Sequence, residues 1–126
     1  MKKLMVIQEH NAVRAGLHWD LRFEDKIKDK KILKSFVIPK HKFPVGTEQI
    51  LALQVEDHVW SYRNFEGELG PGYGQGSVKM VFNNKVEIEK FEKKKIIFKY
   101  EGKKYQIYKC GWIADENAFM IRRKYK

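Results

Sequence analysis

Three polar side chains alternate with three apolar ones from His18 to Phe23, where the sequence reads His-Trp-Asp-Leu-Arg-Phe. Alternate side chains of a β-strand point to opposite faces, so a strand here would place His18, Asp20 and Arg22 in one row. An imidazole and a carboxylate can hold a divalent metal, and a guanidinium can grip a phosphate through two hydrogen bonds. The same row also fits a surface strand with a polar face and one ion pair, and this segment alone supports either interpretation.

A second strand-like run, residues 55–60, reads Val-Glu-Asp-His-Val-Trp and again sets a histidine beside carboxylates. Glu56 and His58 have the same parity, and Tyr62 continues it, so a regular strand would place them on one face. A lone histidine in such a run is usually a hydrogen-bonded structural residue. Two runs that each pair histidine with carboxylate favour a shared chemical site.

A third histidine, His10, follows an apolar N-terminal run. A metal with mixed imidazole and carboxylate ligands needs side chains from several strands that meet at one end of a barrel. His10, Asp20 and His58 could supply two imidazoles and one carboxylate. Such a set leaves coordination positions open for water and for a phosphate oxygen, so the metal could act as a Lewis acid on a phosphoryl group.

The elements that must position these residues are short segments rich in β-branched and aromatic residues, separated by frequent turn signals. Such a pattern is typical of an all-β barrel or sandwich. We expect strands over residues 4–9, 17–24, 31–38, 50–57, 77–82, 85–91, 96–100, 105–110 and 118–124. The Asn83-Asn84 pair predicts a hairpin turn, and a short helix fits residues 113–117. We therefore expect one all-β domain over residues 1–126, a small closed or nearly closed barrel of about eight strands with at most short helical turns.

The formal net charge of +10 indicates a polyanionic partner such as nucleic acid, although a lysine-rich surface can also serve solubility alone. The one cysteine, Cys110, cannot form an internal disulfide, which predicts a reducing compartment. We read Cys110 as a buried thiol at a strand end. No apolar stretch has the length of a signal peptide core or of a membrane span, so we expect a cytoplasmic protein without a membrane partner.

The most glycine-rich stretch, residues 67–76, is not a phosphate-binding P-loop, because it lacks the Gly-Lys-Ser/Thr ending. It is not a dinucleotide fingerprint either, because the segment that follows has the pattern of a strand instead of a helix. We interpret it as tight turns and a barrel corner near the rim of the site.

Taken in order, these motifs resemble the 3′-phosphoesterase domain of bacterial and archaeal DNA ligase D and its free-standing relatives. That family's His-x-Ala-(x)-Arg-x-Leu-His-Tyr-Asp-Leu-Arg pattern, in which the residue in brackets is optional, corresponds to His10 through Arg22. This chain has two more residues between His10 and His18 than the shorter form of the pattern, and Trp19 in place of tyrosine. The other matching blocks are residues 35–40 (Ser-Phe-Val-Ile-Pro-Lys), 55–58 (Val-Glu-Asp-His), 62–76 and 119–124.

The resemblance implies a compact barrel with a manganese-dependent site in its cavity. It also implies an activity that trims 3′ ends at breaks, by removing a terminal ribonucleoside and then the remaining 3′-phosphate. Cobalt, zinc or magnesium could take the place of manganese. Matched position by position, the implied metal ligands are His10, Asp20 and His58. The implied groups at the phosphate are His18, Arg22, Lys40 and Tyr62, with Glu56 as a supporting acid.

Ile50 departs from the family pattern, because arginine is common at that position and would add one phosphate contact that bears on the monoesterase step. The chain also has neither the N-terminal extension of the ligase D domains nor a polymerase or ligase domain, so we expect those activities from separate proteins. The expected substrates are DNA or RNA/DNA primer 3′ ends, and the expected state is a monomer. The alternatives are a non-catalytic nucleic-acid-binding barrel and a phosphodiesterase on small nucleotides. The clustered histidines and acids favour the 3′-end enzyme.

Overall fold

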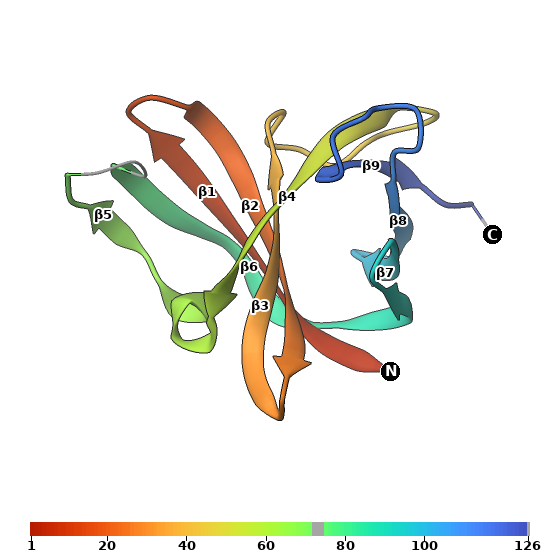
Figure 1. Cartoon of the computed structure of the whole chain (residues 1–126), viewed down its shortest axis with the longest axis horizontal. Helices are drawn as coiled ribbons and strands as arrows, with labels where there is room; N and C mark the ends of the chain where they lie inside the picture. The colour runs from red at the N-terminus through yellow and green to blue at the C-terminus, as the bar shows by residue number, and fades with distance from the viewer. Residues whose placement is uncertain (72–74, 126) are drawn as a thin grey trace.

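The computed structural model describes residues 1–71 and 75–125, and this part of the chain is built almost wholly from antiparallel strands (Figure 1). In chain order the elements are β1 (Lys2–Ala12), β2 (Gly16–Ile27), β3 (Lys30–Ile38), β4 (Gln49–Val59), the 3₁₀ helix η1 (Trp60–Asn64), β5 (Gly67–Leu69), β6 (Gly76–Glu92), β7 (Lys95–Tyr100), β8 (Lys103–Lys109) and β9 (Ala118–Arg123).

Eight of these strands close into a barrel in the order β1-β2-β3-β4-β9-β8-β7-β6, because β6 also pairs with β1. The ninth, β5, pairs with the first residues of β6 and extends away from the barrel (Figure 1). The closed all-β barrel predicted from the sequence is confirmed. Closure pairs the edge strands with each other, so the barrel itself has no free edge.

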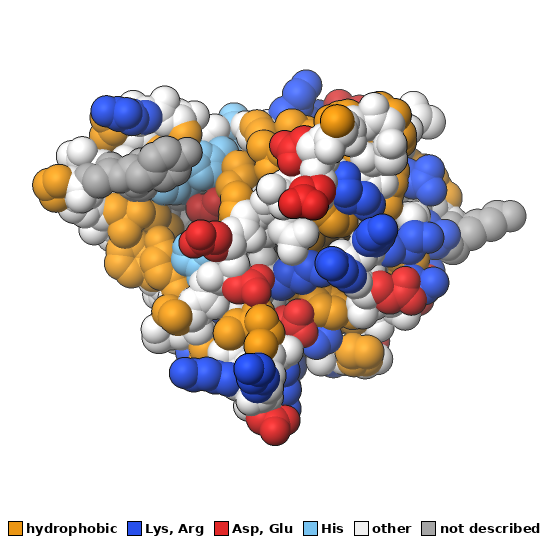
Figure 2. All heavy atoms as spheres, viewed as in Figure 1, with side chains coloured by type: hydrophobic (Ala, Val, Ile, Leu, Met, Phe, Trp, Pro, Cys, Tyr) orange, Lys and Arg blue, Asp and Glu red, His pale blue; other side chains and the backbone are white. Residues whose placement is uncertain are grey.

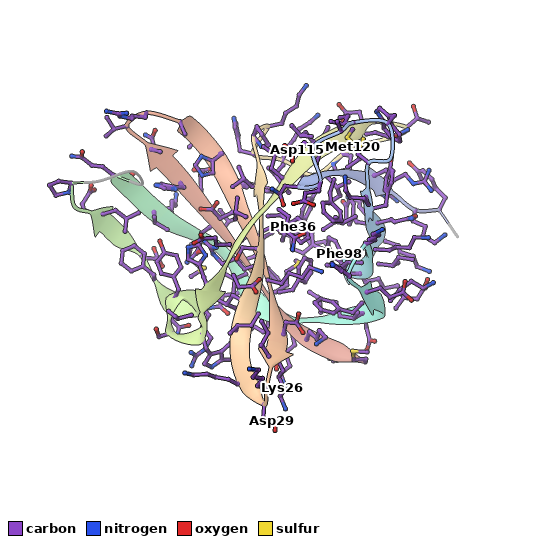
Figure 3. All side chains as sticks on the ribbon, viewed as in Figure 1. Lys26, Asp29, Phe36, Phe98, Asp115 and Met120 are labelled. Carbon is purple, nitrogen blue, oxygen red and sulfur yellow. The ribbon has the colours of Figure 1, made fainter. Side chains whose placement is uncertain are left out.

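The barrel interior is filled by apolar side chains. Met5 and Ile7 of β1 lie opposite Phe23 and Leu21 of β2, and all four are fully buried in one core cluster. Phe36 and Phe98, which are labelled in Figure 3, belong to the same cluster and extend into the barrel from β3 and β7. Side chains alone can fill a barrel of eight strands, and in this barrel the buried apolar cluster makes the interior a packed core.

The hairpin turn predicted at Asn83-Asn84 is wrong, because β6 continues through these residues. β1 pairs with both halves of β6, through Val6 opposite Asn83 and Leu4 opposite Lys85, and this ladder outweighs the turn preference of asparagine. The Asn83 amide instead donates to the Arg63 backbone oxygen at 3.1 Å. One long strand therefore replaces two short ones.

The helix predicted over residues 113–117 is also wrong, because that segment forms turns. The Asp115 carboxylate accepts a hydrogen bond from the backbone N–H of Asn117 at 2.8 Å, as an Asx-turn requires. A five-residue segment gains too little from helical hydrogen bonds to offset the cost of nucleation. Cys110 is fully buried just after β8, as predicted.

The glycine-rich stretch does lead into a strand, β6, but its residues 72–74 lie outside the described part of the chain. Among residues 1–71 and 75–125 there is no helix with the length and apolar character needed to cross a membrane.

Candidate active site

The polar and apolar residues of β2 separate as the alternation predicts. Arg22 lies opposite Val6, Asp20 opposite Gln8, and His18 opposite His10, so these side chains share one face of the β1–β2 pair. Trp19, Leu21 and Phe23 belong to the other face, which packs into the core. The connection between β1 and β2 consists of residues 13–15, and the two histidines on either side of it lie directly opposite each other.

The site lies outside the closed barrel, so the expectation that it occupies the barrel cavity is wrong. Because the apolar face of β2 fills the barrel, the polar face must point outward. There it lines a separate cavity of about 480 Å³, whose walls come from β1–β4, the β1–β2 turn, Tyr62 of η1 and Leu69 of β5. Figure 2 shows histidine side chains in a hollow between the β5 side of the molecule and β4.

His10, His18 and Asp20 form the donor cluster of this cavity. Their ligand atoms all lie within 4.8 Å of one another, and all three residues are buried. The Asp20 carboxylate is 3.5 Å from His10 Nδ1 and 3.4 Å from His18 Nε2. Ligands of one ion at metal–ligand distances near 2.1 Å are separated by roughly 3 to 3.5 Å. The donor types and the two distances from the Asp20 carboxylate therefore fit a divalent metal.

Attraction between His18 and Asp20 shifts the pKa values of both side chains. The hydrogen bond to Asp20 raises the pKa of the His18 imidazole above its ordinary value of 6.5, although burial opposes the shift. Burial pushes the pKa of the Asp20 carboxyl up, but the His18 hydrogen bond and the Arg22 charge outweigh it, so the pKa is lowered. Asp20 is thus ionised at neutral pH and attracts a cation, either a proton on His18 or a metal.

Arg22 is held rigidly beside the cluster. Its Nε donates to the Gln8 side-chain oxygen at 2.7 Å, and one terminal nitrogen donates to Ser35 Oγ at 2.8 Å. The other terminal nitrogen lies 3.5 Å from the Asp20 carboxylate. The guanidinium carbon lies 4.9 Å from the centre of the Tyr62 ring. A guanidinium fixed in this way is preorganised to bind an anion in the cavity.

The cover of the site consists of η1 and β5, which supply Tyr62 and Leu69 to the cavity wall. Gln8, which sequence reasoning missed, connects Arg22 to this cover. Its side-chain nitrogen donates to the backbone oxygens of Tyr62 and Phe65, both at 3.1 Å, while its oxygen accepts from Arg22. Gln8 is fully buried. Its parity with His10 in an otherwise apolar run was the available signal, because a buried amide needs partners.

His58 lines the same cavity, but it is not part of the donor cluster found among the described residues. A β-bulge explains its position: Ser35 lies opposite Val55, whereas Leu33 lies opposite His58, so β4 has one extra residue. The extra residue brings His58 to the face of Val55 and breaks the shared parity expected with Glu56. Glu56 is exposed and does not line the cavity.

The remaining predicted residues lie at the rim or away from it. Tyr62 lines the cavity, with its ring centre 5.0 Å from that of His58. Lys40 is exposed in the loop after β3, next to Pro39, which lines the cavity. Ile50, at the position where arginine is common in the family pattern, faces the barrel core and is 4% exposed.

Burial also lowers the pKa of the His58 imidazole, with the Arg22 charge acting in the same direction. His58 Nδ1 lies 3.2 Å from the Glu56 backbone oxygen. His58 is therefore neutral at pH 7, and donation from Nδ1 leaves Nε2 as the nitrogen that can accept a proton.

Comparison with known proteins identifies one family. The model of the DNA ligase D 3′-phosphoesterase domain matches residues 8–109. A multifunctional non-homologous end joining protein LigD from Mycolicibacterium smegmatis is 41% identical over 87 residues, which are 68% of this chain and 11% of that protein. The corresponding protein of Pseudomonas aeruginosa is 41% identical over 73 residues, which are 57% of this chain and 8% of that protein.

The chain thus spans about a tenth of the length of these curated relatives. The family match begins at Gln8 and includes all the residues that line the cavity. The chain belongs to the DNA ligase D 3′-phosphoesterase domain family.

Proposed function

We propose that this chain is a metal-dependent 3′-end phosphoesterase that acts on nucleic acid. It removes a 3′-terminal ribonucleoside and then the resulting 3′-phosphate, as part of the repair of DNA breaks. One observation carries the proposal: the buried donor cluster lies beside the immobilised Arg22 in a cavity of a family member. The relatives are named for non-homologous end joining, and that process is the one in which we place this activity.

His10, His18 and Asp20 hold the metal in this proposal, and manganese is the ion we expect, although cobalt, zinc and magnesium accept the same donors. The metal supplies Lewis-acid stabilisation of the charge that develops on the phosphoryl oxygens. The ligand set expected from the sequence has His58 instead of His18 as the third ligand, and it remains the alternative. The two assignments differ in which histidine substitution abolishes metal binding.

Arg22 binds a non-bridging phosphate oxygen, and its bonds to Gln8 and Ser35 keep it oriented before the substrate arrives. Tyr62 hydrogen-bonds to the same phosphate from η1. Lys40 contributes charge at the rim, where the strand that leads to the 3′ end enters. Each of these groups favours the transition state over the ground state to the extent that it is aimed at the equatorial phosphoryl oxygens, over which the negative charge is spread.

His58 transfers the proton in this proposal. The lowered pKa keeps its imidazole neutral near pH 7, so Nε2 can take a proton from the attacking water and later give it to the leaving oxygen. Glu56 supports this role through its backbone oxygen, which accepts from Nδ1 and fixes the tautomer. If His58 is a metal ligand instead, His18 performs this transfer.

The test is cleavage of a labelled DNA primer that ends in one ribonucleotide, with and without Mn²⁺. We expect metal-dependent shortening to a 3′-phosphate end, followed by conversion to a 3′-hydroxyl. Asp20→Asn should abolish both steps, whereas His41→Ala, at an exposed loop position, should leave both unchanged. A wild-type protein that retards the primer but never shortens it is the nucleic-acid-binding barrel. Cleavage of free cyclic nucleotides without cleavage of primers indicates the small-nucleotide enzyme.

A further inference from the structure

Nearly all of the net positive charge belongs to the half of the barrel that carries none of the site residues. Residues 1–75 contain 12 Lys and Arg against 10 Asp and Glu, whereas residues 76–126 contain 14 against 6. Figure 2 shows many of the Lys and Arg side chains on the side of the molecule where β8 and β9 lie. A solubility role alone gives no reason for this segregation, so the charged half needs a partner.

The outward face of β7, β8 and β9 is defined by the strand register. Phe98 and Ile107 face the core, so their neighbours Lys99 and Tyr108 face outward. Lys95 lies opposite Tyr108, and Lys99 lies opposite Lys104. Continuing onto β9, Arg122 lies opposite Gln106. We call the set Lys95, Lys99, Lys104, Gln106, Tyr108 and Arg122 the outer basic face.

Three of its four cations are available to an external anion. Lys104 is paired with Glu89 at 2.6 Å. Within residues 1–71 and 75–125, Lys95, Lys99 and Arg122 have no carboxylate oxygen within 4.0 Å. Lys99 and Arg122 are exposed.

Contacts with the Tyr108 ring and the Gln106 amide hold Arg122 in place on this face. The Arg122 guanidinium lies 5.2 Å from the centre of the Tyr108 ring and donates to the Gln106 side-chain oxygen at 3.3 Å. The Tyr108 hydroxyl is hydrogen-bonded to the Gln49 side chain. A guanidinium held over an aromatic ring loses little entropy when it meets a phosphate. The face thus combines cations with an ordered arginine, as nucleic-acid-binding surfaces do.

The outer basic face is continuous with the cavity across β4. Leu51 of β4 lies opposite Met120, which lies opposite Tyr108. On the other side, Leu53 lies opposite Val37, which lies opposite Asp20, and both Leu53 and Val37 line the cavity. Four strand spacings of about 4.8 Å separate β2 from β8, so the path along the surface is roughly 20 Å.

We propose that the outer basic face binds the phosphate backbone of the nucleic acid whose 3′ end occupies the cavity. The proposal rests on the proposed function for the location of the 3′ end. Phosphates of one strand of a duplex rise by about 3.4 Å along the helix axis, so a path parallel to that axis spans roughly six nucleotides. The binding affinity should therefore increase with primer length up to about that distance from the 3′ end and then level off.

Two triple variants with equal loss of charge test this surface. Lys95→Gln, Lys99→Gln and Arg122→Gln neutralise the outer basic face, whereas Lys26→Gln, Lys28→Gln and Lys30→Gln neutralise exposed lysines at the β2–β3 turn. The affinity for an all-DNA duplex with a recessed 3′-hydroxyl is measured by fluorescence anisotropy, without metal, from 50 to 300 mM salt. Neither the binding step nor its readout requires catalysis.

The first triple variant should bind on the order of 100-fold more weakly near 0.1 M salt, and its log–log salt slope should be smaller by about 2 to 3. The control triple should bind like the wild type. Equal weakening of both variants, or of neither, would overturn the proposal. If the triple variant misfolds, Lys99→Gln alone, at an exposed position, provides the test. It should lower the log–log salt slope of the binding affinity by about 1.

Hydrolysis of a dinucleotide by the same variants separates this surface from the proposed function. A dinucleotide is too short to reach the outer basic face, so all variants should hydrolyse it at the wild-type rate. Suppose that neither the wild type nor any variant hydrolyses the dinucleotide, while the first triple variant alone binds DNA more weakly. That result would contradict the proposed function but support nucleic-acid binding by the outer basic face.

Discussion

Residues 1–75 and 76–126 contribute strands to one closed barrel, but the outward faces of these two halves differ in burial. In the first half, the outward face of β1 and β2 lies beneath η1 and β5, and Asp20 is 6% exposed. In the second half, the outward side chains of Lys99 and Arg122 are exposed. In the first half, basic and acidic residues are nearly equal in number, whereas the second half carries most of the excess positive charge.

Strand alternation alone therefore does not make a chemical site. Every strand of the barrel alternates inward and outward residues. Where a cover removes water, an outward polar group must find protein partners, and its charge interactions strengthen because the effective dielectric constant falls. Where no cover lies over the strand, an outward lysine remains solvated and is available to an external anion. The cover built from η1 and β5 therefore separates the two halves functionally.

The largest expected effect comes from removing the central carboxylate of the covered half. Asp20→Ala leaves two imidazoles and one guanidinium without their shared anion, so both metal binding and phosphate orientation fail. We expect activity on the ribonucleotide-ended primer to drop by more than about 1,000-fold, in line with losses of catalytic electrostatic groups. Asp29→Ala at the β2–β3 turn is the matched control and should retain wild-type rates. Comparable activity in the two variants would contradict the site.

A pair of glutamine substitutions compares the two halves directly. Gln8→Leu leaves the Tyr62 and Phe65 oxygens and the Arg22 Nε without their partner in a buried environment, so we expect a loss of roughly 3 kcal/mol in unfolding free energy. Gln106→Leu, also at a buried outward position, removes a single 3.3 Å bond to Arg122 and should cost about 1 kcal/mol or less. Urea unfolding measures both.

Gln8→Leu should also raise KM for short substrates, because Arg22 and Tyr62 lose their common support, whereas Gln106→Leu should leave KM for those substrates unchanged. Equal stability losses with no change in KM would mean that the cover does not depend on Gln8.

The covered cluster should also respond to pH. The raised pKa of His18 means that the folded, metal-free protein keeps this proton above pH 6.5, the ordinary value of the group. Its contribution to stability is present below pH 6.5 and is lost as pH rises through the folded-state pKa. Metal binding must expel the proton, so metal affinity should increase by up to about tenfold per pH unit over that range.

The resulting measurement is the melting temperature with and without Mn²⁺ at pH 6 and pH 8. The metal-induced rise in melting temperature should be larger at pH 8. In Asp20→Asn, which lacks the charge that raises the His18 pKa, the rise should be small at both values. A larger metal effect at pH 6 would show that no imidazole proton is displaced.

The smallest expected effect is at Glu56, at the uncovered margin of the site. Its backbone oxygen, and not its carboxylate, is the group that contacts His58, so Glu56→Gln should change kcat by less than about threefold, as for a surface substitution. Steady-state kinetics on the ribonucleotide-ended primer measure this change. A loss near 100-fold would instead establish the supporting acid role that the family resemblance implies.

The barrel and most of the polar row could be predicted from sequence, because strand alternation depends on local residue order. His18, Asp20 and Arg22 share a face as their spacing indicated. The opposition of His10 and His18 was also within reach, since a hairpin centred near residue 14 sets them across from each other. The turn at Asn83 failed because pairing with β1 decided the course of β6.

The cover could not be predicted, and the location of the site was therefore misjudged. β5 has three residues and η1 has five, which is too short for either to show periodicity. The bulge near His58 adds one residue to β4, and parity arguments cannot detect such an insertion. Both features depend on contacts between distant segments, such as Gln8 with Tyr62.

The proposed metal site consists of His10, His18 and Asp20 in the covered half. Its most direct test is isothermal titration of Mn²⁺ into the wild type, His18→Ala and His58→Ala, with His41→Ala as the control. We predict one site in the wild type and in the control, its loss in His18→Ala, and its retention in His58→Ala with catalysis impaired. Wild-type affinity in His18→Ala together with loss of the site in His58→Ala would contradict this account.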